Sequence, residues 1–455
     1  MGAVTTSQPS TPATFETALA ARVGDMLDAC TKCGACFMAC PITEAAGIGD
    51  ADSQDVVAGV LDIIRHGEGP EAARKWAASC VMSGECIKAC DYGVNPRFLL
   101  SVARLEMTRA KNELPNRRRT GVENFRKLHQ DVTVLSRLQL TDAALERLGQ
   151  RPSGQAAGAE PDGLPDIVFY TGCNALKTPH IPLLCLDIMD ALGVSYQVMG
   201  GPTHCCGVQQ LRAGDAETSG RFAGNTMDKL AKNNSGEVVS WCPSCFVQFT
   251  EVMLPTFERA GQEKPFEMTP FMHFLRRHLD QLRPLLRQRV ELRVALHKHP
   301  GIAGVVEAAQ EILRAVPGVE LIDLDQPAVG LQSFNLAALP AYKRELQLKE
   351  LETARDAGID ALATIYHSDQ RELCAHERDW PFRIVNLLEI VGASMGIAEE
   401  DHYKHLKITQ DADAILAECG DLIARHGLDP IVARRVVISG MLGDQPLPLA
   451  GSAGR

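Results

Sequence analysis

The sequence lacks any long hydrophobic run, since no stretch of its 455 residues approaches the roughly 20 consecutive apolar residues of a membrane-spanning helix. We therefore expect no integral membrane span. It also lacks an excess of basic residues, because 46 Lys and Arg stand against 57 Asp and Glu, a net charge of −11. Phosphate contacts need clustered Lys and Arg, so this balance excludes a general nucleic-acid-binding protein.

Targeting and nucleotide-binding segments are missing as well. The N-terminus, MGAVTTSQPSTPATFET, has neither the basic nor the apolar stretch of an export signal, and we expect residues 1–24 to form a disordered tail. No dinucleotide-binding or flavin-binding motif is present, so a partner chain would have to supply a flavin. We expect a cytoplasmic protein, in which cysteines stay reduced and serve metal sites or catalysis.

Cysteine, by contrast, is abundant, with fifteen residues. The segment CTKCGACFMACP has the C-x2-C-x2-C-x3-C-P spacing of bacterial ferredoxins, formed by Cys30, Cys33, Cys36 and Cys40. Zinc is the competing interpretation, because C-x2-C pairs also suit zinc. The three successive gaps and the trailing proline favour an iron–sulfur cluster.

A second segment, CVMSGECIKAC, places Ser83 where the second cysteine of the motif is expected. In two-cluster ferredoxins the last cysteine of one run ligates the other cluster. This crossed pattern predicts one set of Cys30, Cys33, Cys36 and Cys90, and a second set of Cys40, Cys80 and Cys86. The second set could hold a [3Fe–4S] cluster, a [4Fe–4S] cluster ligated by Ser83 or water, or no cluster. The retained spacing of three cysteines argues against the last alternative.

The fold class predicted is α+β and α/β. Residues 25–110 are expected to form a helical two-cluster ferredoxin domain, and 111–165, polar and then rich in Gly, Ala and Pro, a linker. Strand, loop and helix then alternate over 166–290, and the same order recurs over 291–400. This predicts tandem α/β units with parallel strands and chemistry at the strand carboxyl ends. Residues 401–455 are a C-terminal extension of mixed helix and loop, with no role assigned.

The cysteines of the first α/β unit follow its predicted strands, so they are expected to converge on one face of the sheet. Adjacent cysteines suit one ordinary cubane corner poorly, which indicates a larger or unusual cluster, and a glycine beside them lets the backbone approach the metal. A zinc site of the final C-x2-C pair is the alternative. The residues concerned are Cys173, Cys205, Cys206, Gly207, Cys242 and Cys245.

The pattern C-x31-CCG-x34-C-x2-C resembles the CCG signature of the B and D subunits of heterodisulfide reductase. It is also similar to the iron–sulfur subunits of glycolate oxidase and anaerobic glycerol-3-phosphate dehydrogenase. The resemblance covers most of the chain, as in a fusion of the C and B subunits of heterodisulfide reductase. It implies a noncubane [4Fe–4S] cluster, at which a disulfide is cleaved, held by Cys173, Cys205, Cys206, Cys242 and Cys245.

The second α/β unit departs from this family pattern. Where the first unit has cysteines, it offers His297 or His299, then Leu331–Ser333, then Tyr366, His367 and Asp369. We favour a purely structural half. The alternative is a site for a harder metal such as zinc, made by His297, His299, His367 and Asp369, with Cys374 as a further candidate ligand.

Two functions remain open. The first is a disulfide reductase subunit that receives electrons from a partner flavoprotein and acts on a small-molecule disulfide or thiol, with His204 as candidate proton donor. The second is an electron-transfer subunit of a flavin-linked dehydrogenase, similar to glycolate oxidase, which delivers electrons to a quinone or another carrier. A high-potential [3Fe–4S] centre beside Ser83 would suit the second function but is compatible with both.

Overall fold

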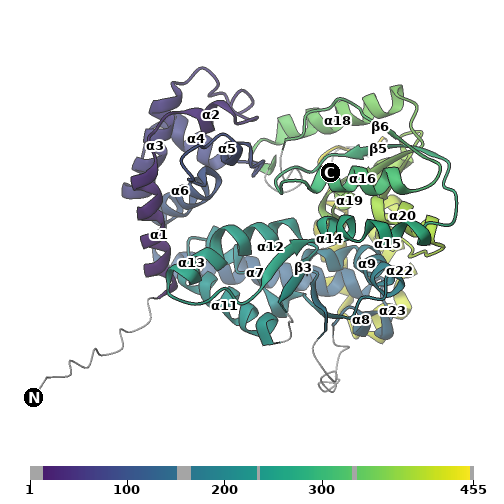
Figure 1. Cartoon of the computed structure of the whole chain (residues 1–455). Coiled ribbons are helices and arrows are strands. Elements are labelled where there is room, and N and C mark those ends of the chain that lie inside the picture. The colour runs from purple at the N-terminus through teal and green to yellow at the C-terminus, as the bar shows by residue number, and fades with distance from the viewer. Residues whose placement is uncertain (1–13, 151–164, 233–235, 330–335, 451–455) are drawn as a thin grey trace, which may run out of the picture.

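The N-terminal part of the chain is helical and stands beside the sheet-containing parts (Figure 1, purple). The structure, a computed structural model, describes residues 14–150, 165–232, 236–329 and 336–450. The helices of this part pack around a core that contains the fully buried Trp76 and Phe98. They are α1 (Phe15–Ala29), α2 (Ala35–Met38), α3 (Ser53–His66), α4 (Glu71–Ser79), α5 (Glu85–Lys88) and α6 (Pro96–Lys111). The predicted helical ferredoxin-like domain is confirmed.

The prediction of a disordered tail over residues 1–24 is wrong from residue 14 onward. Thr14 caps α1, its side chain accepting a hydrogen bond from the Thr17 backbone N–H. Ala18, Leu19 and Val23 lie on one face of the helix and are buried. This apolar face packs against the first α/β unit, which stabilises a helix that polar composition alone would not predict. Residues 1–13 lie outside the described residues.

The predicted linker over residues 111–165 is wrong for its first part, which forms α7 (Leu114–Arg137) and α8 (Asp142–Arg147). The basic N-terminal half of α7 is mostly exposed, whereas Val132 and Leu135 near its end are buried. A long polar helix with a short apolar end is easily mistaken for a linker, because the apolar contacts come from distant segments. Residues 151–164 lie outside the described residues.

Two four-stranded parallel sheets follow, with the orders β2-β1-β3-β4 and β6-β5-β7-β8. The first contains β1 (Ile167–Tyr170), β2 (Tyr196–Met199), β3 (Glu237–Ser240) and β4 (Glu267–Pro270). The second contains β5 (Leu292–His297), β6 (Val319–Ile322), β7 (Ala361–Thr364) and β8 (Arg383–Asn386). The identical orders confirm the tandem α/β repeat. Strands β4 and β8 were not predicted, because they are short and run directly into helices.

Helices connect and cover the strands of each sheet. Those of the first unit are α9 (His180–Ala191), α10 (Val208–Arg212), α11 (Ala216–Lys232), α12 (Pro243–Val247), α13 (Leu254–Arg259), α14 (Phe271–Arg277) and α15 (Leu279–Leu282). A 3-10 turn η1 (Asn174–Lys177) precedes α9, and a π-helical stretch η3 (Gln248–Met253) precedes α13. Those of the second are α16 (Val305–Ala315), α18 (Pro340–Asp356), α19 (His367–Leu373) and α20 (Leu387–Met395). One apolar core joins the inner faces of both units.

The C-terminal extension is helical and packs on the end of α7. Its helices are α21 (His402–Thr409), α22 (Ala412–Glu418), α23 (Gly420–Arg425) and α24 (Pro430–Val436). Leu135, Tyr403 and Val436 share one buried cluster there. Within the described part of the chain, no helix combines the length and apolar character needed to cross a membrane.

Candidate iron–sulfur centres

The two cysteine loops of the N-terminal domain have nearly the same backbone conformation. Gly34 and Gly84 precede the short helices α2 and α5 and lie in the left-handed region, with φ values of 85° and 84°. The residue two positions before each glycine also has a positive φ, 60° in one loop and 62° in the other. Ser83 therefore occupies the position that Cys33 occupies in the first loop. The second loop keeps a cluster-binding conformation although one cysteine is replaced.

Four cysteines meet at the first predicted centre. Cys30, Cys33, Cys36 and Cys90 line one cavity. Burial raises the pKa of the Cys36 thiol to about 12, and the neighbouring Cys30 and Cys33 thiols add to the rise. Iron would supply positive charge that favours the thiolate form of these four cysteines. The donor set fits an iron–sulfur cluster, and the exposed Cys33 brings it close to the surface.

Three further cysteines meet at the second centre. Burial raises the pKa of Cys86, and the adjacent Cys80 and Cys40 thiols raise it further. The neighbouring Ser83 is only 8% exposed, and its hydroxyl accepts a hydrogen bond from the Glu85 backbone N–H at 3.5 Å. Both groups of cysteines thus follow the crossed arrangement of a two-cluster ferredoxin. Their ligation of clusters stays a prediction.

The five CCG cysteines line a single cavity at the carboxyl ends of β1, β2 and β3. Cys245 Sγ donates to Cys206 Sγ at 3.6 Å, and the Gly207 N–H donates to Cys205 Sγ at 3.4 Å. Hydrogen bonds from Cys205 and Cys245 lower the pKa of Cys206. Burial raises the pKa of Cys173 to about 12, with Cys206 and then Cys242 adding to the rise. Five soft donors around one buried cavity fit a thiolate-bound cluster.

Two glycines lie at this site, and the one that faces the cysteines is not the one that the sequence predicted. A Cβ on Gly207 would lie 2.4 Å from the Ser219 carbonyl oxygen, so α11, and not the cluster, requires this glycine. Gly207 also has a φ of 79° at the start of α10. Gly172 is the glycine that faces the cysteines, since a Cβ there would lie 2.7 Å from the Cys242 Cβ.

His204 does not line the cavity of the CCG cysteines, although it precedes Cys205 in sequence. Its Nδ1 is 2.8 Å from the Gly200 carbonyl oxygen, to which the ring donates. Its own carbonyl oxygen accepts a hydrogen bond from the Tyr170 hydroxyl at 2.6 Å. These contacts indicate that His204 stabilises the loop before Cys205. They favour other side chains as the proton donor to a leaving thiolate.

The second α/β unit contributes to the same cavity. The cavity is also lined by side chains of this unit, together with Asp444 of the C-terminal extension: His299, His367, Arg371 and Glu372. His367 hydrogen-bonds the Cys242 thiol, which lowers the pKa of Cys242 after the larger effect of Cys245. The favoured interpretation of the second unit as a purely structural half is not tested by this lining and stays a prediction. The unit's side chains complete the wall of the CCG site.

A buried acid–histidine pair stands within this wall. His299 Nδ1 donates to Asp369 Oδ2 at 2.6 Å, and both side chains are at most 2% exposed. Among the described residues, no hydrogen-bond partner reaches His299 Nε2. The carboxylate orients the ring, and Nε2 is left available for a ligand or substrate.

The alternative metal site of the second unit does not assemble. His297 Nδ1 is hydrogen-bonded to Glu350 Oε2 at 2.6 Å, whereas His299 Nδ1 is hydrogen-bonded to Asp369 Oδ2. Cys374 lies in the core of the C-terminal extension. Within the described ranges, no three of the five predicted ligands bring donor atoms within 4.8 Å of one another. Leu331–Ser333, the predicted counterpart of the CCG element, lies outside the described residues.

Comparison with known families agrees with this division of the chain. Residues 26–94 match the family described as "4Fe-4S dicluster domain", and residues 167–250 match "Cysteine-rich domain", the CCG family. The D subunit of the dihydromethanophenazine:CoB–CoM heterodisulfide reductase of Methanosarcina barkeri is 22% identical over 407 residues. That match covers 82% of this chain and 95% of the relative. The chain is homologous to the D subunit of heterodisulfide reductase.

Further relatives belong to the same class of protein. The corresponding D subunit of Methanosarcina mazei is 22% identical over 66% of this chain and 75% of its own length. The B subunit of the fumarate reductase (CoM/CoB) of Methanothermobacter marburgensis is 21% identical over 80% of this chain and 72% of its own. No solved structure matches. Together the matches support an iron–sulfur electron-transfer oxidoreductase subunit.

Two arginines link the second ferredoxin-type centre to the CCG site. Arg104 bonds the Cys80 carbonyl oxygen at 3.5 Å and the Met82 Sδ at 3.7 Å. Burial lowers the pKa of Arg212 to about 10, with nearby Arg104 adding to the effect and the thiols of Cys206 and the C-x2-C pair opposing it. Cys80, Arg104 and Arg212 line one further cavity, so the centre of Cys40, Cys80 and Cys86 adjoins these two arginines.

Arg97 fixes this arrangement. Its side chain, 5% exposed, forms an ion pair with Glu251 in η3 and donates to the Met82 carbonyl oxygen at 2.8 Å. It also donates to the Gly301 carbonyl oxygen of the second α/β unit, at 2.6 Å. One buried guanidinium therefore joins the N-terminal domain to both α/β units.

Proposed function

We propose that this chain is a reductase subunit that passes electrons from a partner flavoprotein, through two ferredoxin-type centres, to the CCG site, where a small disulfide or related sulfur compound is reduced. The observation that carries the proposal is the cavity of the five CCG cysteines, which is also lined by His299, Arg371 and Glu372. An electron relay needs no proton-holding side chain at its terminal centre. A disulfide reductase does, because cleavage consumes two electrons and two protons to give two thiols.

The order of the centres follows from the contacts. Cys33 is exposed, so the centre of Cys30, Cys33, Cys36 and Cys90 is the entry for electrons from a partner. The centre of Cys40, Cys80 and Cys86 follows, since Arg104 and Arg212 connect it to the CCG cavity. When bound there, a cluster supplies one-electron transfer and an iron that can take up sulfur.

The chain's own side chains supply the proton transfer and the positive charge that the reaction needs. His299 Nε2 is the group that would pass a proton to a sulfur leaving as thiolate, while Asp369 keeps the ring in place. Arg371, largely buried beside the cavity and 3.2 Å from Asp444, adds positive charge that stabilises a thiolate product. The surrounding protein excludes water and orients the substrate.

The second candidate function is electron transfer within a flavin-linked dehydrogenase. It is favoured by Ser83, because a centre with three thiolates can hold a high-potential [3Fe–4S] cluster suited to a quinone acceptor. The similarity to the B subunit of a fumarate reductase agrees with it. In that case the CCG site would bind no substrate.

Electron paramagnetic resonance on anaerobic, redox-poised protein separates the two functions. A new signal that appears only with a particular thiol or disulfide, and is lost in Cys206→Ala, is expected for the reductase. Signals that titrate with potential but never respond to any sulfur compound would instead support the relay.

A further inference from the structure

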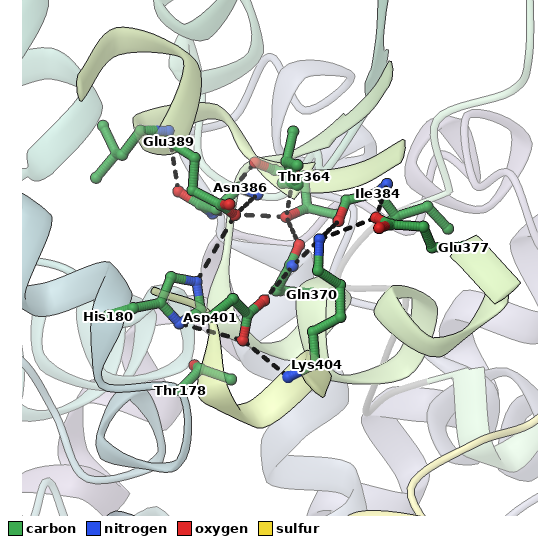
Figure 2. Close-up of polar contacts among 12 residues, drawn as sticks. Thr178, His180, Thr364, Gln370, Glu377, Ile384, Asn386, Glu389, Asp401 and Lys404 are labelled. Carbon is green, nitrogen blue, oxygen red and sulfur yellow. Dashed lines mark hydrogen bonds and ion pairs between the residues drawn. The ribbon is translucent and has the colours of Figure 1, made fainter. Parts of the chain in front are cut away.

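A second buried polar site lies where both α/β units meet the C-terminal extension (Figure 2). His180 begins α9 of the first unit, Glu389 lies in the first turn of α20 of the second, and Asp401 caps α21. All three are described residues, and none of them lines the cavity of the CCG cysteines. The site is therefore separate from the proposed function and does not depend on it.

The imidazole of His180 lies between the two carboxylates. Its Nδ1 is 3.4 Å from Asp401 Oδ1, and its Nε2 is 3.8 Å from Glu389 Oε1. One donor atom can be chosen from each residue so that all three lie within 4.8 Å of one another. The His180 side chain is 1% exposed, yet neither ring nitrogen has a hydrogen-bond partner within the described ranges. A buried imidazole without hydrogen bonds is costly unless a ligand completes it.

The outer contacts hold both carboxylates in position. The Asn386 backbone N–H donates to Glu389 Oε1 at 2.7 Å, and the Gln370 amide donates to Asp401 Oδ2 at 2.8 Å. The Lys404 backbone N–H donates to Asp401 Oδ1 at 2.9 Å. Supporting hydrogen bonds of this kind usually surround metal-binding carboxylates, and each oxygen retains a lone pair for a cation.

Positive charge near the pair comes mainly from Lys404, which also contacts two groups outside the site. The Lys404 ammonium donates to Glu377 Oε2 at 2.9 Å and to the Ile384 carbonyl oxygen at 3.1 Å, as Figure 2 shows. Glu377 therefore shares the lysine with Glu389 and Asp401, and Arg383 adds further positive charge near Glu389. A divalent cation bound between the two carboxylates that face His180 would add to this positive charge.

We propose that His180, Glu389 and Asp401 bind a zinc ion that ties the two α/β units to the C-terminal extension. One imidazole nitrogen and two carboxylate oxygens form a donor set that zinc accepts, with water as a fourth ligand. Magnesium and calcium prefer oxygen-only sites, which the histidine disfavours. The competing arrangement is a proton shared between the imidazole and the carboxylates without metal.

The test uses the full chain with its iron–sulfur clusters loaded anaerobically, incubated with zinc and desalted. About one zinc ion per chain is expected, with only nitrogen and oxygen neighbours at about 2.0–2.2 Å in its X-ray absorption spectrum. Absence of retained zinc, or a zinc–sulfur distance of about 2.3 Å, would overturn the proposal, since sulfur would place the ion in a cysteine site.

Variants provide the second readout. Glu389→Gln keeps the shape of the side chain and should lower zinc retention at least about tenfold at unchanged iron content. His402→Gln changes an exposed histidine next to Asp401 and should retain zinc fully. If Glu389→Gln does not fold, the spectrum of the wild-type chain still decides the matter. Equal zinc retention in both variants would overturn the proposal. A proton shared between His180 and the two carboxylates would then explain why these three side chains lie together.

Discussion

The two α/β units share one strand order but carry different side chains at the carboxyl ends of their strands. In the first unit β1 and β3 lead into Cys173 and Cys242, and in the second β5 and β7 lead into His299 and His367. All four of these side chains line the same cavity. The same fold thus contributes two sets of side chains to one cavity, cysteines from the first unit and histidines from the second.

The second unit lacks the cysteine motif of the first but still contributes side chains to the same cavity. It cannot hold a thiolate-bound cluster, yet the contributing residues follow its strands, where parallel sheets place their chemistry. Substitutions in each unit, and in the two cysteine loops, should separate these roles, from the largest expected effect to the smallest.

Removal of a thiol from the first unit should have the largest effect. We expect Cys206→Ala to lower disulfide reduction more than about 100-fold, because a cluster ligand contributes at least as much as its supporting contacts. Reduction of the ferredoxin-type centres should persist. Cys185→Ala, which removes a buried thiol outside the cavity, is the matched control and should keep activity. Retained activity in Cys206→Ala would exclude the CCG site from the reaction.

Removal of the proton-holding group of the second unit should act on rate alone. His299→Gln is expected to lower kcat about 100-fold, the usual contribution of a general acid. Iron content and cluster spectra should not change. His278→Gln alters a half-buried histidine away from the cavity and serves as control. A full kcat in His299→Gln would return the second unit to a structural role.

A second histidine of the same unit should affect stability. Burial lowers the pKa of His297, but the Glu350 carboxylate outweighs it and raises the pKa to about 9. Because the folded pKa lies above the unfolded value of about 6.5, the stabilisation is complete below pH 6.5 and disappears as the pH rises through 9. It amounts to about 3 kcal/mol. Thermal unfolding of the wild-type chain should show this loss of stability between pH 6.5 and 9. The double variant His297→Gln with Glu350→Gln should not show it.

The two cysteine loops repeat the comparison on a smaller scale, because Ser83 replaces a cysteine in an unchanged backbone. Ser83→Cys should convert a three-iron spectrum into a four-iron one and raise the iron content by about one per chain. Turnover should change little if the centre only carries electrons. An unchanged spectrum and iron content would mean that Ser83 or water already completes a four-iron cluster, or that the centre is empty.

Much of the fold was predictable, because its patterns are local. Buried runs such as Ile167–Tyr170 and the apolar helix of α9 carry their periodicity within a few residues. The polar helix α7 was not recognised, since its stability comes from contacts of Leu135 with residues beyond 400. Composition alone cannot distinguish such a helix from a linker.

The sequence by itself determined which cysteines could bind metal, since ligand spacing is a property of short loops. Only the tertiary structure decided what faces them. His299 and His367 lie more than 120 residues from Cys173, and they reach its cavity because the two α/β units pack against each other. His180, Glu389 and Asp401 are brought together in the same way. Such contacts depend on the packing of whole units, which spacing along the chain does not encode.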